Sequence, residues 1–213
     1  MMTEQKNESG LLAESQQQMV KKGYHHGDLR AALIEATRQL VEEKGPDSFS
    51  VSDACRLAGV STAAPYKHFK DKPEMLTAVV IEGMVRHRAN TLAALEGIER
   101  GTHARIIAIG KEYLNFALRE PGIFRLKFGG FTDRIVDPHL KESGEQTFGV
   151  LLNEVAACLG EPEINDEVRR RSFILWSFVH GLSFILYDKQ LSDMGGHVDL
   201  DALLGDVAKR ILS

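Results

Sequence analysis

The sequence predicts an all-α protein in which a small N-terminal domain of three helices precedes a larger helical domain. Apolar residues recur at helical spacing along most of the chain, and no segment shows the alternation of a β-strand. Glycine and proline interrupt this pattern at the intervals expected of helix ends. The 213 residues suffice for one large domain or two unequal ones, and we expect about nine helices.

The first helix is expected to begin at Asp28, which is suited to be its N-cap, and to stop at Gly45-Pro46. Its apolar residues follow the i, i+3, i+4, i+7 rule: Leu29, Ala32, Leu33, Ala36, Leu40 and Val41. Residues 1–20 are rich in Gln, Glu and Ser, so we expect a disordered arm there. Because this arm has no apolar centre, we do not expect it to be a signal peptide.

A second, short helix is expected over residues 51–58, with Ser50 or Ser52 near its start and Gly59 at its end. Small side chains mark the places where this helix must cross another closely: Ala54, Cys55 and Ala58. Gly59 provides a tight turn, and Val60 fills the gap behind it. These features predict a helix-turn-helix.

The third helix is expected to begin at a cap on Ser61 or Thr62 and to close at Phe69. With Thr62 as the cap, Pro65 is the third helical residue. A proline is tolerated there because amide hydrogens of the first turn lack intrahelical acceptors. Phe69 is expected to be a core residue that holds this helix against the first one.

The later helices are separated by clear stop signals. Lys72-Pro73 opens a long helix, since proline is favoured at a first helical position. The remaining expected segments are 102–119, an aromatic-rich piece at 123–131, 138–159, 164–189 and 199–212. The domains are therefore expected to be the arm at 1–20, a helix-turn-helix domain at 21–73 and a regulatory and dimerisation domain at 74–213.

Charge and composition narrow the classes of function. The net charge is −4, but residues 56–72 carry Arg56, Lys67, Lys70 and Lys72 against Asp71, a local balance of +3. A short basic face on an acidic body suits contact with a polyanion. Two distant cysteines form no disulfide framework or zinc pattern, so a reducing cytoplasm is expected. The apolar stretch 173–187 is too short to span a membrane.

The third helix has the residue types that suit the major groove of DNA. A groove about 12 Å wide favours small side chains at the tip of the entering helix. The residues that we expect to contact DNA are Thr62, Ala63, Ala64, Tyr66, Lys67, His68 and Lys72. The two alanine methyls suit thymine methyls, and Tyr66 and Lys67 suit phosphates.

Structural alternatives remain for three of these residues. Thr62 contacts DNA or only caps the helix, Tyr66 contacts phosphate or packs inside, and His68 contacts phosphate or forms a structural hydrogen bond. Lys72 precedes the fourth helix, whose N-terminal dipole suits another phosphate. The adjacent His25 and His26 lack helical spacing and a third ligand, so no metal is expected.

The segment SVSDACRLAGVSTAAPYKHFKDKPEML resembles the DNA-binding segment of TetR-family transcriptional regulators. The resemblance covers residues 25–76, and YHHGDLRAAL with the AAPY motif is similar to one branch whose C-terminal domain is marked by Trp, His and Gly. Here LWSFVHG supplies Trp176, His180 and Gly181. The resemblance implies an all-α homodimer that represses transcription until a small molecule binds.

The C-terminal half is expected to pair two chains and to hold the effector. The stretch 173–187 is apolar nearly all round, and the last helix has an apolar stripe. Two such helices from each subunit suit a four-helix interface, which places two recognition helices about 34 Å apart over a palindromic operator. The alternative is that they only complete a monomer core. Gly181 is expected to allow close approach between helices.

An effector pocket is expected among aromatic residues of this half: Phe116, Phe124, Phe128, Phe131, Trp176 and His180. Trp176 and His180 lie four apart and share a helix face, where they pack structurally or contact the effector. The long helix from Pro73 joins the domains and is expected to transmit binding by changing the separation of the recognition helices.

The main prediction is a cytoplasmic, dimeric repressor that binds double-stranded DNA and an unknown small molecule, without a cofactor and without membrane contact. Alternatives are an activator, or a regulator that has lost its effector. A different class is a small all-α enzyme or ligand carrier without DNA binding. Because the sequence lacks a glycine-rich phosphate loop, HExxH and a nucleophile elbow, we do not expect an enzyme.

Overall fold

The computed structural model describes residues 29–132, 135–187 and 198–213. The predictions of a disordered arm at 1–20, of an N-cap at Asp28 and of a role for His25 and His26 lie outside the described residues.

The predicted all-α fold is confirmed. The described residues form eight α-helices and one 3₁₀ helix, with no strand among them. In chain order the elements are α2 (Leu29–Lys44), α3 (Val51–Ala58), the 3₁₀ helix η1 (Pro65–Lys67), α4 (Lys72–Ala94), α5 (His103–Arg119), α6 (Pro121–Phe128), α7 (Pro138–Leu159), α8 (Asp166–Tyr187) and α10 (Leu200–Leu212).

Local sequence signals explain where helix α3 begins and ends. Ser50 is the N-cap: its hydroxyl accepts from Asp53 N, and the Asp53 carboxylate accepts from Ser50 N at 2.8 Å. This reciprocal capping box satisfies amides that have no partner within the helix. Gly59 ends the helix with φ 70°, a left-handed conformation that favours glycine.

The third predicted helix is wrong in extent. Residues 61–64 form turns, with Ala64 N donating to Ser61 O at 3.0 Å, and η1 begins at Pro65. No side chain caps η1, so neither Ser61 nor Thr62 is the expected cap. Since Pro65 has no amide hydrogen, it cannot form the bond to residue 61 that an α-helix capped there would need.

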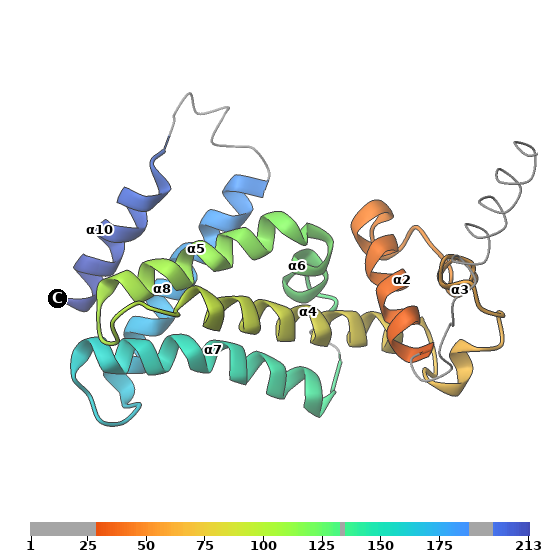
Figure 1. Cartoon of the computed structure of the whole chain (residues 1–213), viewed down its shortest axis with the longest axis horizontal. Coiled ribbons are helices and arrows are strands. Elements are labelled where there is room, and N and C mark those ends of the chain that lie inside the picture. The colour runs from red at the N-terminus through yellow and green to blue at the C-terminus, as the bar shows by residue number, and fades with distance from the viewer. Residues whose placement is uncertain (1–28, 133–134, 188–197) are drawn as a thin grey trace, which may run out of the picture.

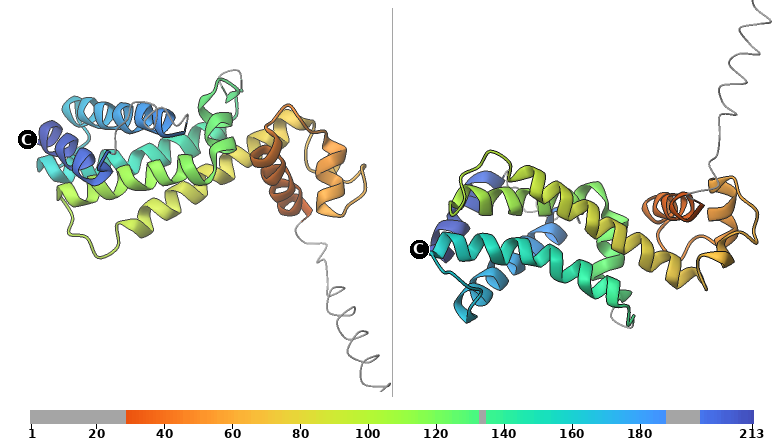
Figure 2. Two further views of the ribbon diagram at one scale, coloured as in Figure 1. Left: turned by 90° about the horizontal axis from the view of Figure 1, so that it is seen from above. Right: turned by 60° about the horizontal axis from the view of Figure 1, so that its bottom comes forward.

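The helices form two parts that are joined by α4 (Figure 1). Helix α2 packs against both α3 and α4, and η1 connects α3 to the start of α4. The rest of α4 enters a body made of α5, α6, α7, α8 and α10. Both views of Figure 2 place α3 at the end of the molecule opposite to α10.

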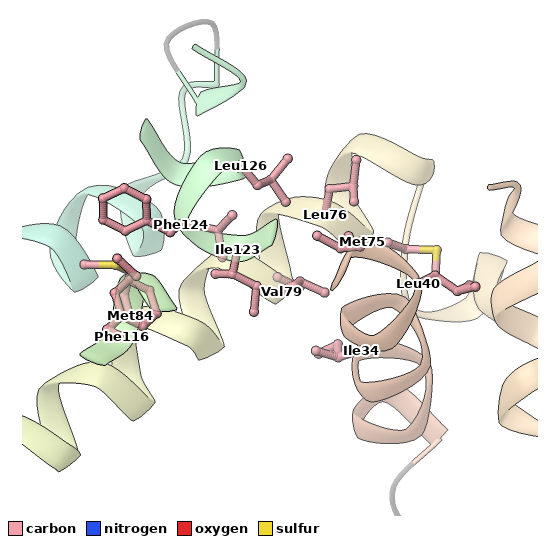
Figure 3. Packing of buried hydrophobic residues seen from close by; sticks show 14 of the residues in the cluster. Ile34, Leu40, Met75, Leu76, Val79, Met84, Phe116, Ile123, Phe124 and Leu126 are labelled. Atoms are coloured by element: carbon pink, nitrogen blue, oxygen red, sulfur yellow. The ribbon is translucent and has the colours of Figure 1, made fainter. Parts of the chain in front are cut away.

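One hydrophobic core extends through both parts (Figure 3). Ile34 and Leu40 on α2 and Val79 on α4 belong to the same buried cluster as Phe116 on α5 and Ile123 on α6. A displacement of α4 or α6 is therefore transmitted to α2, because close-packed interiors transmit strain.

Two further features of the described residues bear on function. Cys55 is fully buried as a packing residue, as predicted, and neither Cys55 nor Cys158 forms a disulfide. No helix in the described ranges is long and apolar enough to cross a bilayer.

Candidate nucleic-acid interface and ligand cavity

The segment between α3 and α4 places its predicted contact residues on the surface. Thr62, Ala63, Lys67 and His68 are exposed, and Tyr66 is 65% exposed. The alternative that Tyr66 packs inside is therefore excluded. These side chains follow one another around a tight turn, so they present a compact polar and basic surface at one end of the molecule.

Two buried side chains anchor this surface to the small domain. Pro65 is buried, and Phe69 is 3% exposed, as predicted for a core residue. The guanidinium of Arg30 on α2 lies 5.4 Å from the centre of the Phe69 ring. Because the buried residues Pro65 and Phe69 flank Tyr66 and Lys67, the latter two side chains are left on the outer side of the turn.

The four predicted cations of this region differ in availability. The exposed side chains of Lys67 and Lys70 form no ion pair with any other described residue. Arg56 is paired with Asp53 at 2.5 Å. Lys72 donates its ammonium to the carbonyl of Phe49 and lies 4.2 Å from the centre of that ring. Lys67 and Lys70 therefore dominate the positive surface that faces solvent.

The expected phosphate site at the start of α4 is corrected by the structure. Lys72 is the first residue of α4, and Asp71 is the N-cap, whose carboxylate accepts from Glu74 N at 2.9 Å. The Glu74 carboxylate in turn accepts from Lys70 N. Two carboxylates thus occupy the helix N-terminus, where they repel a phosphate instead of leaving the helix dipole open to it.

A cavity of about 300 Å³ lies in the body between α4, α5, α6, α7 and α8. Its wall is largely apolar and aromatic. The lining residues are Met84, His87, Thr91, Ile109, Tyr113, Lys127, Phe128, Gly144, Thr147, Phe148, Leu151, Phe173, Trp176 and Val179. A concave apolar wall with a few polar groups is typical of a site for a small molecule.

The structure brings only part of the predicted aromatic set to this cavity. Phe128 and Trp176 line it, whereas Phe116 and Phe124 are each 1% exposed and fill the core instead. Phe131 packs against the core from the side and is outside the lining. The predicted aromatic residues do not all face the cavity, because some must fill the space behind its wall.

His180 lies behind the wall and fixes two of its members. The His180 ring stacks on the Trp176 indole at a centroid distance of 4.8 Å. Its Nδ1 forms a hydrogen bond of 2.9 Å with the Tyr113 hydroxyl. Burial lowers the pKa of His180 and raises that of Tyr113, so both groups are uncharged near neutral pH.

Most of the lining residues were not predicted from the sequence, and His87 is one of them. It is 3% exposed and stacks on Phe116 at 4.6 Å. Burial lowers its pKa to about 4. A signal existed in the sequence: a histidine continues the apolar stripe of α4 at the i+3 position after Met84.

The predicted approach of helices at Gly181 does not occur within one chain. A methyl group added at Gly181 would meet no atom within 4 Å, whereas one added at Gly83 would lie 2.7 Å from Ile123 Cγ2. Gly83 therefore permits a close approach between α4 and α6. Gly181 faces outward on α8.

Comparisons with known proteins agree with this architecture. Residues 33–79 match the model of bacterial regulatory proteins of the tetR family, and residues 106–208 match the tetracyclin repressor-like C-terminal domain. The nucleoid occlusion factor SlmA of Idiomarina loihiensis is 27% identical over 146 residues, which are 66% of this chain and 70% of that protein. A SlmA of Aliivibrio fischeri is 32% identical over 103 residues, 47% and 51% of the two chains.

Solved structures are similar over most of the chain. A protein of unknown function from Rhodococcus sp. RHA1 is 26% identical, with a TM-score of 0.75 over 90% of this chain and 97% of that one. The regulator FadR of Bacillus subtilis in complex with stearoyl-CoA is 17% identical, with a TM-score of 0.59 over 86% and 97% of the chains. The latter likeness concerns the fold.

The chain belongs to the tetR family of bacterial regulatory proteins. It combines the DNA-binding segment of such regulators with a tetracyclin repressor-like C-terminal domain. The assignment to the branch marked by Trp, His and Gly stays a prediction.

Proposed function

We propose that this protein is a cytoplasmic homodimer that represses transcription from a palindromic operator, and that a small molecule in the cavity releases it. The observation that carries the DNA-binding assignment is the joint exposure of Ala63, Tyr66 and Lys67 between α3 and α4. The small side chain of Ala63 allows the backbone to come close to base edges, while the Tyr66 hydroxyl and the Lys67 ammonium are suited to contact phosphates.

The proposed DNA contacts are the exposed residues Thr62, Ala63, Tyr66, Lys67 and His68, with Ala64 beside them. Lys72 has a supporting role: its contact with Phe49 holds the start of α4 against the small domain. Lys70 replaces it as the second cation that faces DNA.

A gel shift with the DNA upstream of the gene tests this surface. Lys67→Ala should weaken binding and reduce the slope of log affinity against log salt by about 1 for each phosphate that is no longer neutralised. Tyr66→Phe should weaken binding without changing that slope. Lys141→Ala is the matched control, since Lys141 is an exposed lysine on α7 in the body. If Thr62→Ala, Tyr66→Phe and Lys67→Ala all bind like the wild type, the assignment is wrong.

The outer face of α8 supports a dimer. Ile174 and Ile185 are 43% and 37% exposed and share a helix face with Gly181. A stripe of apolar and small residues that no other described part of the protomer covers suits close packing against a second copy of the helix. Together with α10 this stripe would form the four-helix interface expected from the sequence.

Sedimentation velocity tests the dimer. Gly181→Arg has room within the protomer but would block the approach of a partner helix, so it should shift the protein towards monomer and weaken operator binding. Gly149→Arg is the matched control, because a side chain at Gly149 also meets no atom within 4 Å. A dimer that is unchanged in Gly181→Arg would rule out this interface.

Two helices connect the cavity to the small domain. Met84 and His87 on α4 line the cavity, and Met75, earlier on the same helix, is buried in the core shared with α2. Helix α6 carries Phe128 in the wall and begins against α2. We expect α4 and α6 to have one arrangement that is compatible with DNA binding and another that is not. An effector that binds the second arrangement more tightly would change the separation of the DNA-binding surfaces of the two subunits.

Operator release tests this control. A compound that binds in the cavity should weaken operator binding, and filling the cavity with Gly144→Leu should reduce its effect. Binding of the compound without any change in DNA affinity would point to a ligand carrier instead of an effector-controlled repressor.

A further inference from the structure

His87 lines the cavity, and its imidazole has a buried nitrogen that lacks a partner. Nδ1 of His87 is buried and forms no hydrogen bond with any described residue. The other such side-chain atom in the described ranges is Ser172 Oγ, which does not line the cavity. An unpaired buried polar atom is unfavourable, so a ligand group that pairs with it gains more affinity than one that meets apolar wall.

The position of the His87 ring is set by its neighbours. The ring stacks on Phe116 at 4.6 Å and an interplanar angle of 16°, and it meets the edge of Tyr113 at 5.6 Å. The side chain is 3% exposed and is part of the wall. The imidazole is therefore held in one orientation before any ligand enters, which favours a specific hydrogen bond.

The charged groups around His87 leave it neutral at pH 7. Burial lowers its pKa to about 4 despite the acidic neighbours Glu112 and Glu120, and Arg119 lowers it further. Glu112 and Arg119 are paired with each other at 2.6 Å. A neutral imidazole has one N–H donor and one acceptor nitrogen. A hydroxyl both donates and accepts, so it pairs with either tautomer.

The other polar groups of the wall already have partners. The Thr91 hydroxyl donates to His87 O at 2.9 Å, and the Thr147 hydroxyl donates to Ser143 O at 2.7 Å. The Lys127 ammonium lies 5.9 Å from the centre of the Phe128 ring. The remaining surface is apolar, so most of the ligand must be apolar as well.

Aromatic rings and volume narrow the ligand further. Phe128, Phe148, Phe173 and Trp176 line the cavity and suit a flat apolar body. A volume of about 300 Å³ is at the low end for ligand pockets. We propose that the effector is a small, uncharged alcohol or phenol whose hydroxyl pairs with His87. This inference rests on the proposed function, because it assigns a ligand class to the same cavity.

Three probe molecules of similar shape test the ligand class by equilibrium dialysis against the full chain without DNA. Thymol carries a hydroxyl, p-cymene is the same hydrocarbon without it, and 4-isopropylbenzoate carries a charge. Thymol should bind roughly three- to tenfold more tightly than p-cymene, the gain expected from one buried hydrogen bond. The benzoate should bind more weakly than thymol.

Variants assign the hydroxyl to its partner. His87→Phe keeps a ring to stack on Phe116 but removes both nitrogens, so the preference for thymol over p-cymene should disappear while p-cymene still binds. Thr147→Val is the matched control: it removes a polar group of the same wall that already has a partner, and the preference should remain.

Several results would overturn the inference. They are failure of thymol to bind the wild type, equal affinity for p-cymene, tighter binding of the benzoate, and a thymol preference that survives His87→Phe. Operator release is measured separately. Thymol that binds through His87 without releasing DNA would support the ligand class and contradict the proposed effector control.

Discussion

The contact between the small domain and the body depends on Glu42, a residue whose replacement has a calculable effect. Its carboxylate, near the end of α2, accepts hydrogen bonds from Gly122 N at 2.8 Å and Ile123 N at 3.0 Å. These are amides of the first turn of α6, which have no partner within the helix. Glu42→Ala removes the acceptor and leaves both amides without it.

The magnitude follows from two charge-assisted bonds in a half-buried place. A hydrogen bond to a charged group contributes about 1.5–3 kcal/mol, and partial exposure with the return of carboxylate hydration reduces this. We expect Glu42→Ala to lower the free energy of unfolding by about 2 kcal/mol and Tm by roughly 4–8 °C for a chain of this length. Glu42→Gln keeps one acceptor oxygen and should lose about half as much.

Urea and thermal unfolding followed by circular dichroism measure this loss. Glu43→Ala is the matched control, since Glu43 is the exposed neighbour on the same helix. A Glu42→Ala protein within about 0.5 kcal/mol of the wild type would refute the reasoning, because surface substitutions of no consequence fall in that range. Equal losses in Glu42→Ala and Glu42→Gln would show that the contact is not made through an acceptor oxygen.

The pH dependence of this contact has a definite sign. Burial raises the pKa of Glu42, and the nearby Glu120 adds to the shift. The folded state therefore holds this proton more tightly than the unfolded state. The pH-dependent part of the Glu42 contribution to stability is therefore fully present below the unfolded pKa of 4.5 and is lost as pH rises through the raised value, while the hydrogen bonds from Gly122 and Ile123 oppose the rise of this pKa. Glu42→Gln should remove this part of the pH profile.

Three further substitutions have expected outcomes that unfolding experiments check. The pKa of His87 is lowered from 6.5 to about 4, so the wild type should lose stability as pH falls through that window, on the order of 3 kcal/mol, and His87→Phe should not. Gly83→Ala should cost about 1–3 kcal/mol, because its methyl group would lie 2.7 Å from Ile123 Cγ2. Arg105→Ala should cost about 3 kcal/mol, because it leaves the largely buried Glu154 carboxylate without its partner at 2.6 Å.

Each of these substitutions has a control, and the first two also have a result that would contradict them. His139→Gln replaces an exposed histidine and should leave the acid profile unchanged, whereas an unchanged profile in His87→Phe would contradict the assignment. Gly149→Ala meets no atom within 4 Å and should stabilise the helix by about 0.5–1 kcal/mol. If Gly83→Ala also stabilised the protein, the result would show that Ile123 on α6 can move to make room for the added methyl group. Arg169→Ala is the control for Arg105→Ala: it removes an exposed arginine and should change stability little.

Helix positions were predictable because their signals are local. Ser50 and Gly59 mark the two ends of α3, and Gly160 ends α7 with φ 69°, as expected from the sequence. Such residues act through their own backbone conformation or through bonds to amides three residues away. The resemblance to TetR-family regulators, which depends on residues 25–76, predicts the same fold independently of these helix-end signals.

The turn at Pro65 shows where a local signal misleads. A proline in the first turn is tolerated in an α-helix, but here the missing amide hydrogen moves the start of helical structure to Pro65 itself. Most of the predicted contact residues nevertheless face solvent: they are Thr62, Ala63, Tyr66, Lys67 and His68, whereas Ala64 and Lys72 are half-buried.

The cavity could not be assigned from aromatic content. Whether Phe116 or Phe128 faces a cavity depends on how five helices pack, and both have the same sequence character. Charge availability was also beyond the sequence: Lys72 counts as a cation in composition, yet its ammonium is bonded to Phe49 O. Such pairings connect residues 23 positions apart and appear only in three dimensions.

The place of Trp176 has a practical consequence. The chain contains one tryptophan, and its indole forms part of the cavity wall while it stacks on His180. The wavelength and yield of indole emission depend on the polarity next to the ring, and here the whole signal has a single origin. The intrinsic fluorescence of the unmodified protein can therefore report whether a compound occupies the cavity. Compound libraries can be screened in this way without a dye or an attached label.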